Sequence, residues 1–196
     1  MSSSASPLAE LLADLDRALA ALGLRWYLFG AQAAILHGVA RLTADVDVTV
    51  EAGALANAVL VDRLALNGFE LRVPDAEGFV ERTRVLPLVH TRSRLPLDVV
   101  LAGPGLEELF FSRAEEQSIG DLRVPVASAE DIVTMKILAG RAKDLDDVAA
   151  ILRARPVDPA RVRSTLRLLE QALDRRDLIV EFERLLEQTG RLRPLD

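Results

Sequence analysis

Leucines recur at helical spacing near the start of the chain and predict a first helix over residues 8–22. The apolar stripe consists of Leu8, Leu11, Leu12, Leu15, Leu19 and Leu22. Ser6 and Pro7 suit the cap and first turn of this helix, and Gly23 suits its end.

Beyond residue 24 the apolar pattern alternates between short strand-like runs and helical segments. We expect strands at 25–29, 41–51, 69–73, 79–85, 86–91 and 95–101, and helices at 31–37, 54–66 and 106–115. A hairpin is expected at Gly120-Asp121, and short connections between the later strands favour antiparallel neighbours. This order predicts an α+β fold with a mixed sheet flanked by helices.

From Ser128 onward the pattern is helical. Ser128 followed by Asp131 is close to a capping box, Asp158-Pro159 predicts the start of another helix, and a last helix is expected over 177–188. We therefore expect two parts, an α/β core over residues 1–125 and a C-terminal helical subdomain over residues 126–196.

Composition excludes several classes of protein. The 196 residues contain no cysteine, which excludes disulfides and thiolate metal sites, and two histidines disfavour a zinc site. A net charge of −6 argues against nucleic-acid binding by the whole chain. No basic leader and no apolar run near the roughly 20 residues of a membrane span is visible, so we expect a cytoplasmic protein with no membrane partner.

The segment 41–50 alternates like a strand but carries two aspartates, a residue type that strands disfavour. With a period of two, Arg41, Thr43, Asp45 and Asp47 share one face, and the two carboxylates lie about 7 Å apart. Like charges at this distance repel, and a hard divalent cation with oxygen ligands removes the conflict. An edge strand with solvated acids is the other interpretation.

A third acid supports a metal site. Residues 95–101 are apolar on both faces except for Asp98, and a strand buried on both sides should not carry a lone carboxylate. Asp98 therefore either pairs with a buried base or joins Asp45 and Asp47 at a metal. Three carboxylates on neighbouring strands can hold two Mg²⁺ or Mn²⁺ ions at a phosphoryl transfer site.

Two further segments offer groups that suit phosphates. The strand ending at Phe29 passes through Gly30-Ala31 into a helix, where backbone N–H groups can face an anion. Lys136 lies among apolar neighbours, so it either extends its ammonium outward to solvent or reaches a triphosphate. The charges from Arg141 to Asp147 are also typical of a helix with salt bridges along its exposed face.

Together these motifs resemble the nucleotidyltransferase-fold superfamily, and within it most closely the bacterial branch of AbiEii-type toxins. The resemblance covers roughly residues 24–152. Its motifs are Gly30-Ala31, Asp45-Val46-Asp47, Asp98, Lys136 and the run Arg141-Ala142-Lys143-Asp144-Leu145-Asp146-Asp147. Ala31 departs from the Gly-Gly or Gly-Ser turn of the family and supplies only a backbone N–H.

The resemblance implies roles for these residues. Asp45, Asp47 and Asp98 would bind metal and act with Lys136 in catalysis, Asp98 as the candidate base for an acceptor hydroxyl. The nucleotide would contact the set Gly30, Ala31, Arg41, Thr43, Lys136, Arg141, Asp144 and Asp147. A nucleoside triphosphate would donate its monophosphate to RNA, tRNA or protein, or to a small molecule, within a toxin–antitoxin system that includes a cognate antitoxin or toxin.

Three other interpretations remain at this point. Asp45-Val46-Asp47 also fits the nucleophile motif of haloacid-dehalogenase-like phosphatases, although the apolar run that should precede it is missing. A regulatory or antitoxin protein could keep the fold without turnover. Several arginines between residues 153 and 167 are either a solvated helix face or a docking strip for RNA or an acidic partner.

Overall fold

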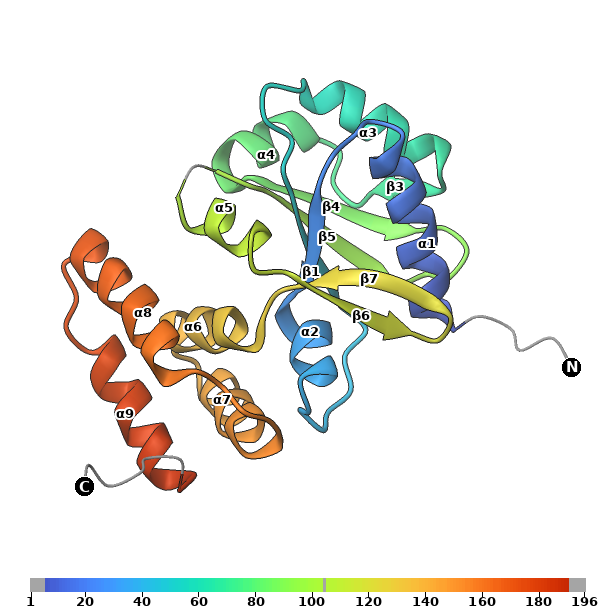
Figure 1. The fold of residues 1–196 in the computed structure, drawn as a ribbon. Coiled ribbons are helices and arrows are strands. Elements are labelled where there is room, and N and C mark those ends of the chain that lie inside the picture. The colour runs from blue at the N-terminus through green and yellow to red at the C-terminus, as the bar shows by residue number, and fades with distance from the viewer. Residues whose placement is uncertain (1–5, 104, 191–196) are drawn as a thin grey trace, which may run out of the picture. The chain divides into compact units, whose positions relative to one another are not determined.

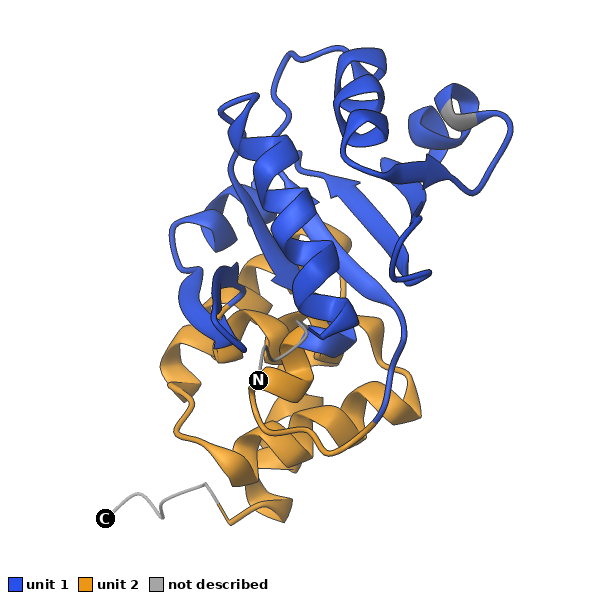
Figure 2. Cartoon of the chain, turned by 90° about the vertical axis from the view of Figure 1, so that its right-hand side faces the viewer, with its two compact units in different colours: residues 1–32, 42–127 blue, residues 33–41, 128–196 orange. Residues whose placement is uncertain are grey.

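The computed structural model describes residues 6–103 and 105–190, apart from the side chain of Ala76. The chain forms two compact units, coloured separately in Figure 2. The first, here called the sheet unit, consists of residues 1–32 and 42–127, and the second, the helical unit, consists of residues 33–41 and 128–196. The predicted division after residue 125 assigned 33–41 to the α/β core, whereas the structure places this segment with the C-terminal helices.

The sheet unit contains a seven-stranded mixed sheet in the order β3-β4-β5-β2-β1-β7-β6. Its strands are β1 (Trp26–Phe29), β2 (Val46–Val50), β3 (Phe69–Leu71), β4 (Val85–His90), β5 (Pro96–Leu101), β6 (Glu115–Ile119) and β7 (Leu122–Val126). β2 pairs with β5, and β1 with β7, in parallel; the other neighbours are antiparallel. The α+β class and the hairpin at Gly120-Asp121 are thus confirmed.

The sheet unit also contains helices, which Figure 1 labels. They are α1 (Pro7–Ala20), the first turn of α2 (Gly30–Leu36), α3 (Asn57–Leu66), α4 (Ala76–Thr83) and α5 (Leu106–Phe111). The Ser6 hydroxyl accepts the Ala9 N–H at 3.2 Å and caps α1, as its sequence predicts. On α1 the buried Asp14 carboxylate meets His90 Nε2 at 3.0 Å and fixes the helix against β4.

Two predicted strands are wrong in whole or in part. Residues 79–85 were expected to be a strand, but helix α4 occupies 76–83 because the Asp75 carboxylate accepts the Gly78 N–H and caps it. The strand expected over 41–51 is regular only from Val46 to Val50. Within the irregular part, the Asp45 N–H donates to the Thr43 hydroxyl instead of to a neighbouring strand.

The helical unit is built from α6 (Ala129–Ala139), α7 (Ala142–Ala154), α8 (Pro159–Leu173) and α9 (Leu178–Gln188). α6 contacts the other three helices. Ser128 and Asp158 cap α6 and α8 through the N–H groups of Asp131 and Ala160, as predicted. In the part of the chain that the structure describes, no helix is both long and apolar enough to cross a membrane.

The segment 33–41 joins this unit through specific contacts. Arg155 hydrogen-bonds to the buried ring of His37, and Arg41 forms an ion pair with Asp147. A Cβ at Gly38 would collide with Ala154, and Gly38 has a positive φ of 106° that glycine adopts without strain. The segment therefore packs as part of the helical core.

Candidate active site

One row of residues crosses the sheet unit and contains two of the predicted acids. Asp47 on β2 lies directly opposite Asp98 on β5, and Asp98 lies opposite Pro87 on β4. Partners in register point to the same face, and neighbouring strands lie about 4.8 Å apart. The structure therefore brings the carboxylates of Asp47 and Asp98 together, although 51 positions separate them in the sequence.

Gly30 lies against one end of this row. β1 ends at Phe29, which is in register with Asp47, and Gly30 follows with a positive φ of 65°. A Cβ at Gly30 would lie 2.8 Å from Cγ of Asp47, closer than real Cβ atoms approach a neighbour. The site requires glycine here for two reasons, the backbone conformation and the close approach of Asp47.

Arg72 reaches the other end of the row. Its N–H donates to the carbonyl of Pro87 at 2.9 Å, and its guanidinium forms an ion pair with Asp98. The Nε of Arg72 also donates to the carbonyl of Leu88 at 2.9 Å, which anchors the side chain on β4. Both partners are about 40% exposed, and such pairs contribute only about 0–1 kcal/mol, so a stronger cation can displace Arg72.

Asp98 was expected in a strand buried on both faces, and this expectation is wrong. In β5 only Leu97 and Val99 are buried, while Asp98 and its neighbours on the same face are partly exposed. Asp98 pairs with Arg72, but this base is about 40% exposed and so is not the buried partner that the sequence suggested. The part of Asp98 in a metal site with Asp45 and Asp47 stays a prediction.

Asp45 lies outside β2, on an exposed stretch of chain before it. Within residues 6–103 and 105–190, no three acidic or histidine side chains come together as a ready-made metal site. Two oxygen donors in register still suit Mg²⁺, which is usually held by one or two carboxylates with substrate phosphates completing the shell. The residues present therefore fit a divalent cation that arrives with a nucleotide.

The helical unit contains a second cluster of predicted residues, centred on Lys136. Lys136 does not extend to solvent: its side chain is 8% exposed, and Nζ donates to Asp147 at 2.5 Å and to Asp144 at 3.3 Å. Both carboxylates come from the first two turns of α7. Lys136 lies near the end of α6, so the turn at Gly140 brings the three groups together.

Two arginines complete this cluster. Arg141, at the N-cap position of α7, binds Asp144, and Arg41 binds Asp147 at 3.2 Å. Burial opposes ionisation of Asp144, but the hydrogen bond from Arg141 and the charge of Lys136 hold the pKa of Asp144 below its usual value. Among the described residues the buried Nε of Arg41 has no acceptor. With three cations around two carboxylates, the cluster suits an additional anion.

Helix α2 changes one argument made from the sequence. It has seven residues, Gly30 to Leu36, which is too short for a strong helix dipole at its N-terminus. The side chain of Ala31 is buried, and Thr43 is half-buried in the irregular segment before β2. Binding of nucleotide by Gly30, Ala31 and Thr43 stays a prediction, and the close approach of Gly30 to Asp47 is the firmer observation.

The family described as nucleotidyl transferase AbiEii toxin, type IV TA system, matches residues 11–195. The chain belongs to the AbiEii family. This membership confirms the resemblance seen in the sequence and removes the phosphatase interpretation. Among curated proteins there is no match.

Solved structures share the fold of this AbiEii-family chain at low sequence identity. The antibiotic-resistance factor ANT(2'')-Ia has a TM-score of 0.57 at 13% identity, over 84% of this chain and 91% of its own. An antigenic nucleotidyltransferase-like protein from Paracoccidioides brasiliensis has 0.55 at 19%, over 89% and 91%. The lincosamide antibiotic adenylyltransferase LnuA, solved with lincomycin, has 0.51 at 16%, over 78% and 100%.

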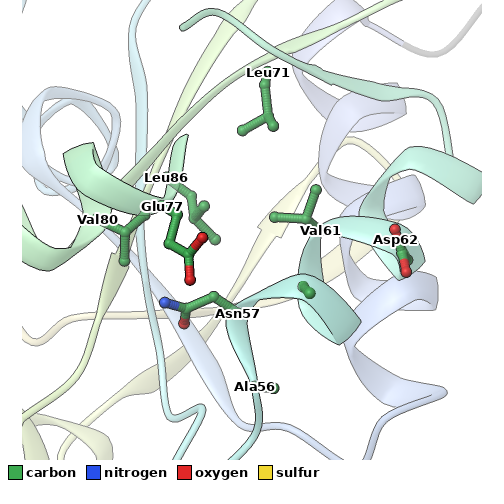
Figure 3. A pocket seen from close by; sticks show the side chains of 9 residues that line it. Ala56, Asn57, Val61, Asp62, Leu71, Glu77, Val80 and Leu86 are labelled. Carbon is green, nitrogen blue, oxygen red and sulfur yellow. The ribbon is translucent and has the colours of Figure 1, made fainter. Parts of the chain in front are cut away.

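A cavity of about 360 Å³ lies elsewhere in the sheet unit, between α3, α4, β3 and β4. In Figure 3 Val61, Leu71 and Leu86 form apolar walls, while Asn57 and Glu77 point toward one another. Leu86 pairs with Val99, whose neighbour Asp98 points to the opposite face of the sheet. The cavity thus lies on the face away from the carboxylate row, and none of the predicted site residues lines it.

Sequence reasoning missed two residues that contact this site. Arg72 binds Asp98, and Gln32 donates from Nε2 to the carbonyl of Thr43 at 3.1 Å. Neither has a signal in the sequence, since an arginine near a strand end and a glutamine in a helix are ordinary. Their contacts depend on the strand order and on the path of the chain before β2.

Proposed function

We propose that this AbiEii-family chain transfers a nucleoside monophosphate from a nucleoside triphosphate to an acceptor hydroxyl, with Mg²⁺ or Mn²⁺ as cofactor. One observation carries the proposal: Asp47 and Asp98 lie in register on one face of adjacent parallel strands, beside the side-chain-free Gly30. Two carboxylates about 5 Å apart can share a divalent cation, which carries more charge than the guanidinium that now pairs with Asp98.

Asp47 and Asp98 would hold the divalent cation, with Asp45 as a further oxygen donor. The cation would supply positive charge to the phosphates. Arg72 would leave Asp98 when the cation binds, because their half-exposed ion pair is weak. The arginine is then free to face the added negative charge of the nucleotide.

Asp98 would accept the proton of the acceptor hydroxyl. The acceptor oxygen forms a bond to the α-phosphorus, the bond from that phosphorus to the bridging oxygen breaks, and pyrophosphate leaves. Gly30 and its neighbours would hold the triphosphate end in place, so that most of the rate gain comes from positioning and electrostatics.

The predicted role of the Lys136 cluster belongs to the same proposal. Arg41, Lys136 and Arg141 would supply positive charge for the triphosphate, with Asp144 and Asp147 holding Lys136 and the arginines in place. The buried Nε of Arg41, which lacks an acceptor among the described residues, supports this role because a phosphate oxygen would satisfy it.

For the acceptor we propose RNA, tRNA included, or a protein, within a toxin–antitoxin system. The family description, a type IV toxin, supports the toxin role. The solved relatives contribute only the fold, so a small-molecule acceptor remains an outcome that the experiment must separate.

The test is a labelling assay with a matched pair of variants. The wild-type protein, Asp47→Asn and Asp62→Asn are incubated with Mg²⁺ and each α-³²P-labelled nucleoside triphosphate. A bacterial lysate, separated into RNA, protein and small molecules, supplies acceptors. Asp62 is an exposed aspartate of α3 outside the row, so its change to Asn controls for the loss of one charge.

We expect label in one fraction with wild type and with Asp62→Asn, and at least a thousandfold less with Asp47→Asn, because this carboxylate is needed for the cation. Thermal unfolding should show that Asp47→Asn is still folded, so that the loss of label reports on the site and not on the fold. Equal labelling by Asp47→Asn would refute the site. No label in any fraction, despite measured binding of the triphosphate, would instead favour a non-catalytic partner protein.

A further inference from the structure

The irregular segment before β2 is held by two hydrogen bonds. Gln32 Nε2 donates to the carbonyl of Thr43 at 3.1 Å, and the Thr43 hydroxyl accepts the N–H of Asp45 at 3.2 Å. We call these two bonds the Gln32–Thr43 clamp. All three residues belong to the sheet unit.

Gln32 is a buried amide at the start of a helix. Its side chain is largely covered, with the residue 8% exposed, although glutamine is usually found at the surface. A buried carboxamide needs hydrogen-bond partners, and the Thr43 carbonyl is one. The contact therefore fixes the position of the chain at Thr43 relative to the first turn of α2.

The same turn of α2 also meets Asp47. Gly30 lies two residues before Gln32, and a Cβ at Gly30 would collide with the Asp47 carboxylate. The two ends of the Asp45-Val46-Asp47 motif are thus both set by α2, Asp47 by the close approach of Gly30 and Asp45 by the clamp. Asp47 is also fixed by β2, whereas Asp45 precedes the strand and is exposed.

We propose that Gln32 is a positioning residue for Asp45, acting through the Thr43 turn to fix the backbone that presents this carboxylate to a divalent cation. The inference rests on the proposed function. Without the clamp, the exposed segment would populate many backbone conformations, and binding of the cation would have to select one of them. Gln32 itself touches neither the cation nor the nucleotide in this proposal.

The first test uses Gln32→Met, which preserves side-chain length and removes the donor. Gln171→Met, an exposed change of the same type on α8, is the matched control. Binding of Mn²⁺ alone is measured by electron paramagnetic resonance, without nucleotide or turnover. Hydrogen exchange of the amides of residues 43–46 and thermal unfolding are measured on the same samples.

We expect Gln32→Met to bind Mn²⁺ about threefold to tenfold more weakly, the change that corresponds to losing one ordinary hydrogen bond. Exchange at Asp45 should accelerate, and the apparent KM for the metal should rise more than kcat falls. Gln171→Met should match wild type in Mn²⁺ affinity, in hydrogen exchange at Asp45 and in the apparent KM for the metal. Unchanged Mn²⁺ affinity in a folded Gln32→Met would overturn the inference.

A second pair tests the other bond of the clamp and protects against a variant that fails to fold. Thr43→Val removes the hydroxyl that accepts the Asp45 N–H, whereas Thr43→Ser keeps it. Thr43→Val should weaken Mn²⁺ binding as Gln32→Met does, and Thr43→Ser should restore most of it. Equal affinity in the two Thr43 variants would contradict the clamp.

Asp47→Asn separates this inference from the proposed function. Loss of Mn²⁺ binding in Asp47→Asn, with wild-type binding in Gln32→Met, would retain the metal site and reject only the clamp. Wild-type binding in Asp47→Asn would reject the metal site itself, whatever the Gln32 variant does.

Discussion

The sheet unit and the helical unit each contain a cluster of aspartates, but the two clusters differ in exposure and in ion-pair partners. On the sheet, Asp98 is about 40% exposed and its partner Arg72 is equally open to solvent. In the helical unit, Asp144 and Asp147 are only 3% and 5% exposed and share the buried ammonium of Lys136. The partly exposed aspartates of the sheet can accept a cation from solvent, whereas the buried aspartates of the helical unit already bind the Lys136 ammonium.

This difference shows that a motif aspartate can have either of two tasks. A buried carboxylate requires a fixed partner, because the penalty for an unpaired charge in the interior is several kcal/mol, roughly, for each ion. A partly exposed one is stable without a fixed partner and can therefore bind a ligand cation. Asp144 and Asp147 hold Lys136 and the arginines, whereas Asp47 and Asp98 are the residues to which the proposed function assigns the metal.

The largest effect on stability is expected from replacing Lys136, whose ammonium is buried in the helical unit. Lys136→Met should destabilise the protein by about 3–5 kcal/mol, because two buried carboxylates lose their shared partner. Lys143→Met, at an exposed position of α7, should change stability by less than about 0.5 kcal/mol. Urea unfolding followed by circular dichroism measures both, and similar midpoints for the two variants would show that the Lys136 cluster is not a buried unit.

A smaller effect should separate backbone strain from crowding at the sheet. Gly30 and Gly23 have nearly the same positive φ, 65° and 67°, but only Gly30 has a neighbour, Asp47, where a Cβ would lie. Gly23→Ala should cost about 1–2 kcal/mol for the left-handed conformation alone. Gly30→Ala should cost about 1–3 kcal/mol more, or displace Asp47 and abolish turnover. Thermal midpoints and the labelling assay, measured for both variants, separate the two causes. Equal effects of Gly23→Ala and Gly30→Ala would refute the close approach of Asp47 to Gly30.

The smallest effect is a dependence on pH in the helical unit. The folded pKa of Asp144 lies below its usual value of 3.8, so its contribution to stability is complete above that value and is lost as the pH falls from there through the lower folded pKa. The stability difference between wild type and Asp144→Asn should therefore narrow between pH 5 and pH 3. Denaturant midpoints across this range measure it, with Asp146→Asn, an exposed neighbour, as control. A difference that stays constant or widens toward acid would contradict the ionised cluster.

Local signals predicted local structure well. The caps at Ser6, Ser128 and Asp158 could be predicted because each cap side chain accepts an N–H group no more than three residues further along the chain. The strand expected from Arg41 was wrong in its first half because the Thr43 hydroxyl takes the Asp45 N–H that a ladder would use. Alternating side chains alone did not reveal this competition.

Contacts between distant segments were predictable only where an acid stood out against an apolar background. Asp98 was noticed because its strand is otherwise apolar, and its position beside Asp47 follows from the parallel pairing of β2 and β5. The partnership of Arg72 with Asp98 requires knowing that β4 lies between their strands and carries a proline there. The contact of Arg41 with Asp147 requires knowing that 33–41 packs with α7.

The assignment of residues 33–41 to the helical unit also affects the order of events during synthesis. Residues 42–127 leave the ribosome after this segment and before the helices that it joins. His37 and Arg41 therefore have to wait for Arg155 and Asp147, their distant partners, while the chain between them folds as a sheet. A polypeptide truncated after residue 127 would contain the carboxylate row, but its segment 33–41 would lack the helices against which it packs. A nascent chain can therefore bring Asp47 and Asp98 together before Lys136 has been translated.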